Sequence, residues 1–276
     1  KKLTNKGAPI QDLNTVRKHT SRARGGALAV AAYPAEVISL IASDVPDDDI
    51  EIIASGPTVL DSSTVADAQA IIAKYGITAG TNIQFIETQK DEKYFKRVTN
   101  MLFLSNKDAL FSMRGKAEQM GYATTIADGH FTGEARAVAR EIAEKLHGAP
   151  ANTALLYAGE STVTLGDANA GGPSPRRSGL RSSEGGRNQE MALSVLLDVR
   201  DNELILPFAS DGRDNTDHAG AIADDTTRAH AREKNLSIEG HLNAHSSYDF
   251  FKSSGDALIT GYTGSNVSDL VIALKK

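Results

Sequence analysis

The sequence predicts an α/β protein of layered domains with mixed or parallel sheets. Short apolar runs alternate with helix-like segments from about residue 101 onward, and this alternation is typical of layered α/β domains with parallel strand pairing. Residues 78–96 are polar and weakly periodic, which indicates a connection between two domains. We therefore place a partial N-terminal α/β domain at residues 1–92 and a C-terminal α/β domain at residues 93–276.

The N-terminal part begins with a basic helical segment. Residues 11–32 are predicted to be helical, with a break or close packing at Gly25 and Gly26. Arg17 and Lys18 lie in a crowd of basic side chains on this segment. Such a run is usually a solvated face, and the alternative is a contact to an anion.

A continuous apolar run, Val37–Ala42, predicts a buried parallel strand. Ligands of open α/β sheets bind beyond the carboxyl ends of the strands, so Asp44 is well placed for chemistry. Alternatively, Asp44 only begins a turn. A second apolar run covers residues 50–58, and a helix is expected at residues 64–75 before Gly76.

The C-terminal part alternates between strands and helices. We expect strands at residues 101–104, 123–126, 153–157, 204–209 and 270–274, and helices at residues 108–120, 132–146 and 188–198. Residues 162–165 are a candidate hairpin partner of the strand at 153–157.

A glycine pair, Gly185 and Gly186, precedes a helix whose first turn carries Arg187 and Asn188. The free N–H groups and the positive dipole end make such a helix start an anion site, and Arg187 adds a planar set of donors. Alternatively, the glycines only turn the chain and Arg187 is solvated. The loop at residues 167–184 is rich in Gly, Ser, Pro and Arg, and we expect a mobile insertion or a flap over a bound phosphate.

Two further loops follow predicted strands. Residues 210–217 contain Asp211 and Asp214, whose carboxylates are suitable ligands for a hard divalent cation, although acidic loops are common. Residues 258–266 contain Gly264 and Asn266. A loop of this composition either brings N–H groups to a phosphate or sugar hydroxyl, or forms a tight turn.

The composition excludes several classes of function. The net charge of −5 argues against a nucleic-acid platform. The absence of cysteine excludes disulfides and thiolate zinc sites and fits a reducing compartment. No apolar run approaches the ~20 residues that span a bilayer, so we expect a cytoplasmic protein without membrane contact. The sequence contains no GxSxG elbow, no Walker A loop and no GxGxxG after a strand.

Five motifs occur in one order: NTVRKHTSRARGGALA, SLIASDVPDDDIEIIASGPTVLD, AGESTVTL with GGRNQEMAL, SDGRDNTDHAGAIAD and TGYTGSNVSDL. Together they make the chain resemble, from about Asn14 to its end, the type II glycerate kinases. Members of that family combine DUF4147 and MOFRL regions, and some are labelled hydroxypyruvate reductases. The resemblance implies two α/β domains with the active site in the cleft between them. It also implies ATP-dependent, magnesium-assisted phosphorylation of glycerate to 2-phosphoglycerate.

The resemblance assigns roles to single residues. Asp44 is similar to a cleft carboxylate near the substrate hydroxyl. Glu160 and Arg187 are similar to the paired residues of the GGE and GGRNQE motifs, although Ala158 replaces the first glycine. The implied set is Asp44, Glu160 and Arg187 for catalysis, Asn14, Arg17 and Lys18 for glycerate, Gly185, Gly186, Asn188, Gly264 and Asn266 for ATP, and Asp211 and Asp214 for Mg²⁺.

The chain departs from the family pattern in two places. The Rossmann-like segment with its GKA lysine and SGGGSAL-type loop is missing, so the first domain is expected to be incomplete. The gap between Glu160 and Arg187 is also wider, because the basic loop is inserted there. We therefore expect the chain alone to be nearly inactive, and a missing N-terminal segment supplied in trans to restore turnover. A further copy of this chain, in a homo-oligomer, is also considered as a partner.

Two other functions compete with the kinase. The reductase label suggests an NAD(P)-dependent hydroxypyruvate reductase, which tight NAD binding without ATP binding would favour; the chain has no dinucleotide fingerprint. The other is a non-catalytic binding or assembly fragment of a split kinase, suggested by the missing segment.

Overall fold

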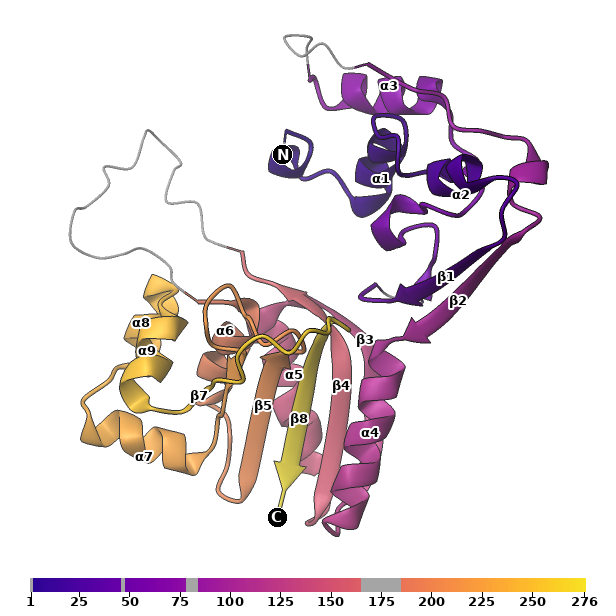
Figure 1. Cartoon of the computed structure of the whole chain (residues 1–276). Helices are drawn as coiled ribbons and strands as arrows, with labels where there is room; N and C mark the ends of the chain where they lie inside the picture. Colours follow the sequence, from indigo (N-terminus) through magenta and orange to yellow (C-terminus); the bar gives the residue numbers. More distant parts are fainter. Residues whose placement is uncertain (1, 46–47, 78–83, 165–184) are drawn as a thin grey trace. The chain divides into compact units, whose positions relative to one another are not determined.

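The computed structural model describes residues 2–45, 48–77, 84–164 and 185–276 (Figure 1). The chain divides into two compact units, Lys1–Ser105 and Asn106–Lys276. The predicted division after residue 92 stays a prediction. The first unit extends further because β2 (Val98–Leu104) pairs with β1 (Val37–Ala42).

The first unit combines short helices with a two-stranded parallel sheet, β1 and β2. A small core of Leu3, Val16 and Ala68 holds two of the helices together. The helices of this unit are α1 (Ile10–Lys18), α2 (Ala27–Ala32) and α3 (Val65–Lys74), with 3₁₀ turns at Thr4–Lys6, Ile53–Ser55 and Glu92–Tyr94.

The predictions for the first unit are confirmed in part. The strand Val37–Ala42 and its parallel pairing are confirmed. Its expected burial is wrong for one face, since Ile38 and Leu40 are 64% and 65% exposed. The helix expected at residues 11–32 is interrupted between Lys18 and Ala27, and the predicted break at Gly25 and Gly26, which have φ values of 57° and 80°, lies at the end of this interruption.

The second apolar run of the first unit does not form a strand. Ala54 and Ser55 have positive φ, so this segment folds into a 3₁₀ turn at Ile53–Ser55. The helix expected at residues 64–75 is confirmed as α3. A capping box begins it, in which the Thr64 side chain accepts from the Asp67 N–H and Asp67 accepts from the Thr64 N–H.

The second unit is built on a six-stranded mixed sheet of order β3-β4-β8-β5-β6-β7 (Figure 1). Strands β3 and β4 are parallel, and β8 lies antiparallel between β4 and β5. The α/β class with mixed sheets is therefore confirmed. The strands are β3 (Ala123–Glu134), β4 (Thr153–Thr162), β5 (Glu203–Ala209), β6 (Gly220–Ala221), β7 (Ala257–Leu258) and β8 (Asp269–Lys275).

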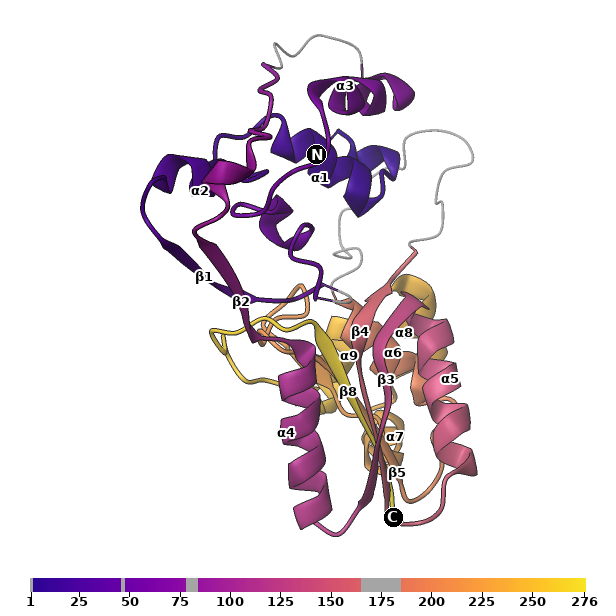
Figure 2. The ribbon, with the colours of Figure 1, turned by 90° about the vertical axis from the view of Figure 1, so that its right-hand side faces the viewer.

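Helices cover both faces of this sheet. Figure 2 shows α4 on one face and α5 on the other. Leu110 of α4 packs on Leu156 and Leu270, whereas α5 and α6 cover the opposite face. The helices are α4 (Asn106–Gln119), α5 (Ala135–Gly148), α6 (Arg187–Val195), α7 (Asp225–Glu233), α8 (Ile238–Ala244) and α9 (Ser247–Ser254).

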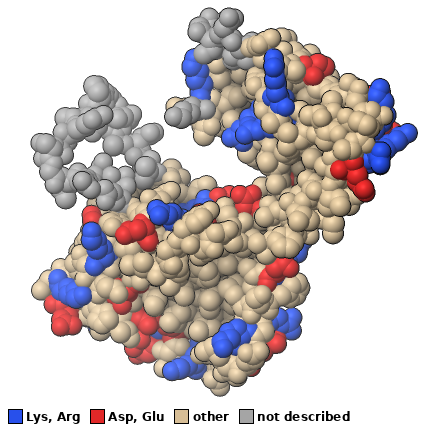
Figure 3. Space-filling view, in the orientation of Figure 1, with Lys and Arg blue, Asp and Glu red and all other residues tan. Residues whose placement is uncertain are grey.

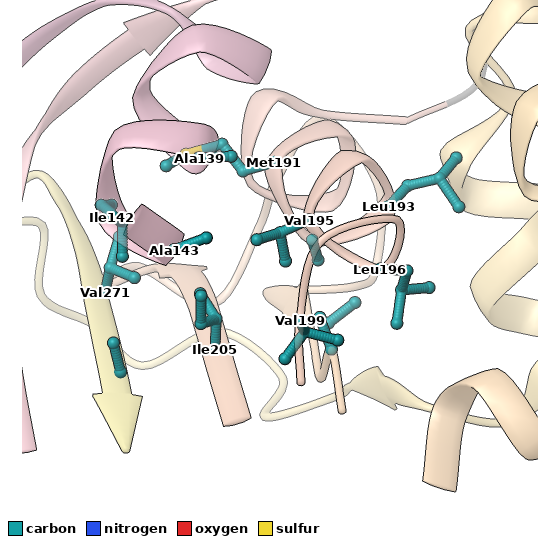
Figure 4. Close-up of a cluster of buried hydrophobic side chains, with 14 of the residues drawn as sticks. Ala139, Ile142, Ala143, Met191, Leu193, Val195, Leu196, Val199, Ile205 and Val271 are labelled. Carbon is teal, nitrogen blue, oxygen red and sulfur yellow. The ribbon is translucent and has the colours of Figure 1, made fainter. Parts of the chain in front are cut away.

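The main core lies between α5, α6 and the sheet (Figure 4). Small side chains on α5, including Ala139 and Ala143, leave room for Met191 and Val195 of α6. The side chain of Ile205 on β5 fills the space beneath them. This packing fixes the N-terminal end of α6 against the ends of the central strands.

Two boundary predictions in the second unit are wrong. The hairpin partner expected at residues 162–165 is wrong for its described part, because Thr162 belongs to β4 and pairs with Glu134 of β3, and residues 163–164 form no strand; residue 165 lies outside the described residues. For the same reason the helix expected from residue 132 begins at Ala135. The loop at residues 167–184 lies outside the described residues. Among the helices of the described ranges, none is long and apolar enough to cross a membrane.

Candidate active site

A pocket of about 410 Å³ lies in the second unit, where the end of β4 meets the start of α6. Arg187 and Glu190 line it from α6, and Asn215 lines it from the acidic loop. Its other lining residues are Ser161, Thr162, Val163, Gly185, Gly186, His245 and Ser247.

The two glycines before α6 are required by close contacts. A Cβ on Gly186 would lie 2.0 Å from Cγ of Asp214, and a Cβ on Gly185 would lie 2.2 Å from Oγ of Ser247. Gly185 also has a φ of 154°, at the edge of the range that L side chains rarely adopt. The glycine pair therefore lets the acidic loop and the start of α9 pack closely against this helix terminus.

Asp214 caps α6 from a distant part of the sequence. Its Oδ1 accepts from the N–H and Nδ2 of Asn188, both at 3.2 Å. Its Oδ2 accepts from the N–H of Gln189 at 2.8 Å and from Nε2 at 3.2 Å. Asp214 is only 4% exposed. Burial raises its pKa to about 6, although the Gln189 and Asn188 hydrogen bonds oppose this shift.

Arg187 is held between two carboxylates. Its Nε donates to Oδ2 of Asp269 at 2.5 Å and its Nη2 to Oδ1 at 3.3 Å. Its Nη1 lies 2.5 Å from Oε1 of Glu160. Burial alone would lower the pKa of Arg187, but the two carboxylates outweigh it and raise the pKa. The guanidinium therefore stays charged beside the pocket.

A second group of polar side chains lies at the pocket, which Glu190 and His245 line. Glu190 is buried, and its Oε1 accepts from Nε of Arg136 at 2.9 Å. His245 Nδ1 lies 3.1 Å from the same oxygen. Arg136 also donates to the carbonyl oxygen of Leu242, which fixes it against the end of α8.

The two polar loops predicted from the sequence lie beside each other. Thr263 N–H donates to the carbonyl oxygen of Asp211 at 3.0 Å, and Oδ1 of Asp211 accepts from the N–H of Arg213. Oδ1 of Asn266 accepts from the N–H of Ser268 at 3.2 Å. Gly264 has a φ of 79° and is exposed. Asp211, Gly264 and Asn266 do not line the pocket.

The carboxylates of the acidic loop do not form a ready magnesium site. The four hydrogen bonds of Asp214 occupy about all the acceptor positions of a carboxylate. In the part of the chain that the structure describes, no group of three His, Cys, Asp or Glu side chains is arranged to hold a metal. Asp211, whose Oδ1 accepts one N–H, fits a single-carboxylate contact to Mg²⁺, which often binds mainly through water and substrate phosphates.

The remaining predicted residues lie in the first unit. Asn14 is buried, donates to the carbonyl oxygen of Ile52 and accepts from Nη1 of Arg17 at 3.2 Å. Lys18 Nζ lies 3.1 Å from Oδ1 of Asp61. Burial raises the pKa of Asp61, but hydrogen bonds from Ser63 and Lys18 outweigh this and lower it. Asp44 lies just beyond the C-terminal end of β1, as expected.

The sequence did not single out Asp269, Arg136 and His245, whose contacts organise the pocket. Asp269 stands in the TGYTGSNVSDL motif, but only the sheet register places it opposite Gly159 and so next to Arg187. Figure 3 shows Lys and Arg side chains interspersed with Asp and Glu on the visible face of the described residues.

Comparison with known proteins links both parts of the chain to one kind of enzyme. Residues 1–86 match the family described as "Domain of unknown function (DUF4147)", and residues 153–269 match the MOFRL family. Glycerate 2-kinase of Pyrococcus horikoshii is 36% identical over 293 residues, which cover 99% of this chain and 63% of that protein. Glycerate kinase of Macaca fascicularis is 32% identical, with 97% of this chain and 79% of that protein covered.

A solved structure has the same fold. The crystal structure of glycerate kinase (EC 2.7.1.31) from Thermotoga maritima superposes with a TM-score of 0.82 at 32% identity, covering 100% of this chain and 66% of that one. The chain thus spans less than two thirds of the length of the Pyrococcus horikoshii relative.

Proposed function

The chain belongs to the glycerate kinase family, and on that premise we propose that it takes part in ATP-dependent phosphorylation of glycerate to 2-phosphoglycerate. The names of the Pyrococcus horikoshii relative and of the Thermotoga maritima structure support the reaction. The 2-hydroxyl as acceptor follows the name glycerate 2-kinase. ATP as donor, the cytoplasmic location and a homo-oligomeric state stay predictions.

The observation that carries this proposal is the pocket at the start of α6. Phosphoryl transfer asks a protein mainly for positioning and for neutralisation of phosphate charge. The N-terminal end of α6 brings Gly185 and Gly186 to one side of the pocket, and Arg187 adds a cation. Asn188 does not line the pocket, because it is buried and both its N–H and its Nδ2 donate to Asp214, so its predicted contact with ATP is not supported. We assign to Arg187 the contact with transferred phosphate, and to Glu160 a role through its ion pair with Arg187.

Residues of the first unit are assigned to glycerate. Arg17 and Lys18 are proposed to pair with its carboxylate, since Asn14 and Asp61 restrain these two cations. Asp44 is proposed to orient or deprotonate the attacking hydroxyl from its place beyond β1.

The loops around Asp211 and Asn266 are assigned to the nucleotide side. Gly264 and Asn266 are proposed to contact ATP phosphates or ribose. A bound Mg²⁺ would neutralise phosphate charge, and Asp211 is the side chain available to hold it. The predicted role of Asp214 as a metal ligand is not supported by its four hydrogen bonds to α6.

The test is an assay with ATP, Mg²⁺ and D-glycerate in which ³¹P NMR separates 2-phosphoglycerate from 3-phosphoglycerate. It is run on this chain alone and on the chain mixed with the part of the Thermotoga maritima enzyme that the chain does not cover. We expect 2-phosphoglycerate in the mixture, formed roughly a hundredfold more slowly when the chain carries Arg187→Ala. Absence of product from the folded proteins, or NADH-dependent reduction of hydroxypyruvate in its place, would overturn the proposal.

A further inference from the structure

The two carboxylates that contact Arg187 differ in burial and in geometry. Asp269 is 2% exposed and faces Nε and Nη2 of the guanidinium with both of its oxygens. The Glu160 side chain is 54% exposed and meets only Nη1. A two-point contact with a buried carboxylate fixes the plane of the guanidinium, whereas a single contact to an exposed one does not.

Asp269 is itself held rigidly. It is the first residue of β8 and pairs with Gly159 on β4 and with Ala209 on β5, in the middle of the sheet. The hydroxyl of the preceding residue, Ser268, donates to the carbonyl oxygen of Gly159 at 2.6 Å. Neither the backbone nor the carboxylate of Asp269 is therefore free to follow a ligand.

Glu160 has the opposite properties. It lies near the end of β4, and its exposed ion pair with Arg187 is of the kind that contributes ~0–1 kcal/mol. A phosphate group brings more negative charge to the same guanidinium donors than a single carboxylate does. Phosphate therefore competes well with Glu160 for Nη1, and poorly with Asp269 for Nε and Nη2.

We infer that Asp269 is a positioning residue that fixes the Arg187 guanidinium, and that Glu160 is a displaceable counter-ion that covers the ligand-binding edge of Arg187. A phosphate-bearing ligand takes the place of Glu160 while the contacts to Asp269 stay intact. This inference rests on the proposed function, because it assumes that Arg187 is the phosphate contact of the pocket.

The first test is the affinity of the full chain for phosphate, measured by calorimetry at low salt. Removing the charge of the counter-ion in Glu160→Gln should tighten binding, by up to about fivefold if the pair contributes as exposed pairs do. Loss of the anchor in Asp269→Asn should weaken binding, by about tenfold or more. ATP and 2-phosphoglycerate are titrated separately. The ligand that binds more tightly to Glu160→Gln and more weakly to Asp269→Asn carries the phosphate that contacts Arg187.

Two matched variants control for charge and burial. Glu118 forms an exposed pair with Arg114 at 2.7 Å on α4, outside the pocket, so Glu118→Gln should leave phosphate affinity unchanged. Glu203 is a buried acid on β5 that contacts His147 and Lys275. Glu203→Gln should lower the melting temperature without changing phosphate affinity.

The second test needs no variant at the anchor and therefore holds even if Asp269→Asn does not fold. The Nε–H of Arg187 is followed by ¹⁵N NMR. Its resonance should be slow to exchange with water and should keep its shift on addition of phosphate and in Glu160→Gln. The Nη resonances of the same side chain should move with added phosphate.

Two results would overturn the inference. One is a shift of the Nε–H on phosphate addition as large as that of the Nη groups. The other is weaker binding of all three ligands by Glu160→Gln. Failure of the proposed function is distinguishable from failure of this inference. If the two variants change phosphate affinity in opposite directions but no 2-phosphoglycerate forms, the inference is supported and the kinase function is refuted.

Discussion

Arg187 serves the fold as well as the pocket. From the sequence alone, Arg187 is expected at an exposed helix start, where substitution by alanine would leave the free energy of unfolding unchanged. In the structure the guanidinium compensates the buried carboxylate of Asp269. Breaking such a pair leaves an unpaired buried charge, which typically costs ~3–5 kcal/mol of stability.

We therefore expect Arg187→Ala to lower turnover by roughly a hundredfold and also to lower the free energy of unfolding. The double variant Arg187→Ala with Asp269→Asn should regain much of the stability but none of the turnover. Urea denaturation and the ³¹P assay measure the two effects. Additive losses of stability in the double variant would contradict the buried pairing.

The pKa of Asp214 predicts a dependence of stability on pH. The pKa is raised from 3.8 to about 6 in the folded state, so folding favours the protonated form. The contribution of Asp214 is fully present below about pH 4 and is lost as pH rises through 6, by roughly 3 kcal/mol in total. Comparison of denaturation curves for wild type and Asp214→Asn between pH 4 and 7 isolates this slope. A stability difference between wild type and Asp214→Asn that instead stays constant or grows as pH rises would show that the four N–H donors outweigh burial in setting the pKa of Asp214.

At the scale of residues, sequence motifs and structure agree on which segments meet but not on every partner. The motifs paired Glu160 with Arg187, and their side chains are in contact. Asp269 could not be found in this way, because it is distant in sequence and reaches Arg187 only through the register of β8. Asp214 looked like a free loop carboxylate because its helix-capping contacts are also non-local.

At the scale of elements, the start of α6 depends on how closely the acidic loop approaches Gly186. The Cβ of an alanine there would fall within the Asp214 side chain. We expect Gly186→Ala to lower stability by about 2–4 kcal/mol and to abolish phosphate binding, since overpacking would displace Asp214 and the first turn.

Gly115 on α4 provides the matched control for this substitution. It lies inside a helix with nothing within 4 Å of an added Cβ. Gly115→Ala should raise stability by about 0.5–1 kcal/mol through helix propensity alone and leave phosphate affinity unchanged. Chemical denaturation of both variants is the measurement, and similar effects of the two would contradict the contact at Gly186.

Local sequence patterns are sufficient to predict several of the strands and helices. The run Val37–Ala42 is a strand, and the helices predicted near residues 108–120 and 188–198 exist as α4 and α6. Errors occur where pairing extends an element beyond its apolar run, as in β3 up to Glu134 and β4 up to Thr162. Local patterns cannot predict that extension, because the partner strand stabilises it. The helices α7, α8 and α9 were not predicted.

At the scale of the whole molecule, the two units differ in how much apolar surface they bury. The second unit holds the main core and covers both faces of its central strands with helices. The first unit has a small core and a two-stranded sheet on which Ile38, Leu40 and Phe103 are 64%, 65% and 70% exposed. Sheets of two strands are marginal without further packing, so the units should differ in stability.

We therefore expect a fragment of residues 106–276 to fold cooperatively and to bind phosphate with the affinity of the full chain, because every residue lining its pocket lies in that unit. Limited proteolysis of the full chain should degrade the first unit earlier, since segments with few buried apolar contacts open most easily. A fragment of residues 1–105 should bind a hydrophobic dye through the exposed face of β1 and β2. Circular dichroism melts and phosphate calorimetry on the 106–276 fragment decide the matter. An unfolded fragment, or a folded one that has lost phosphate binding, would mean that the second unit and its pocket depend on the first.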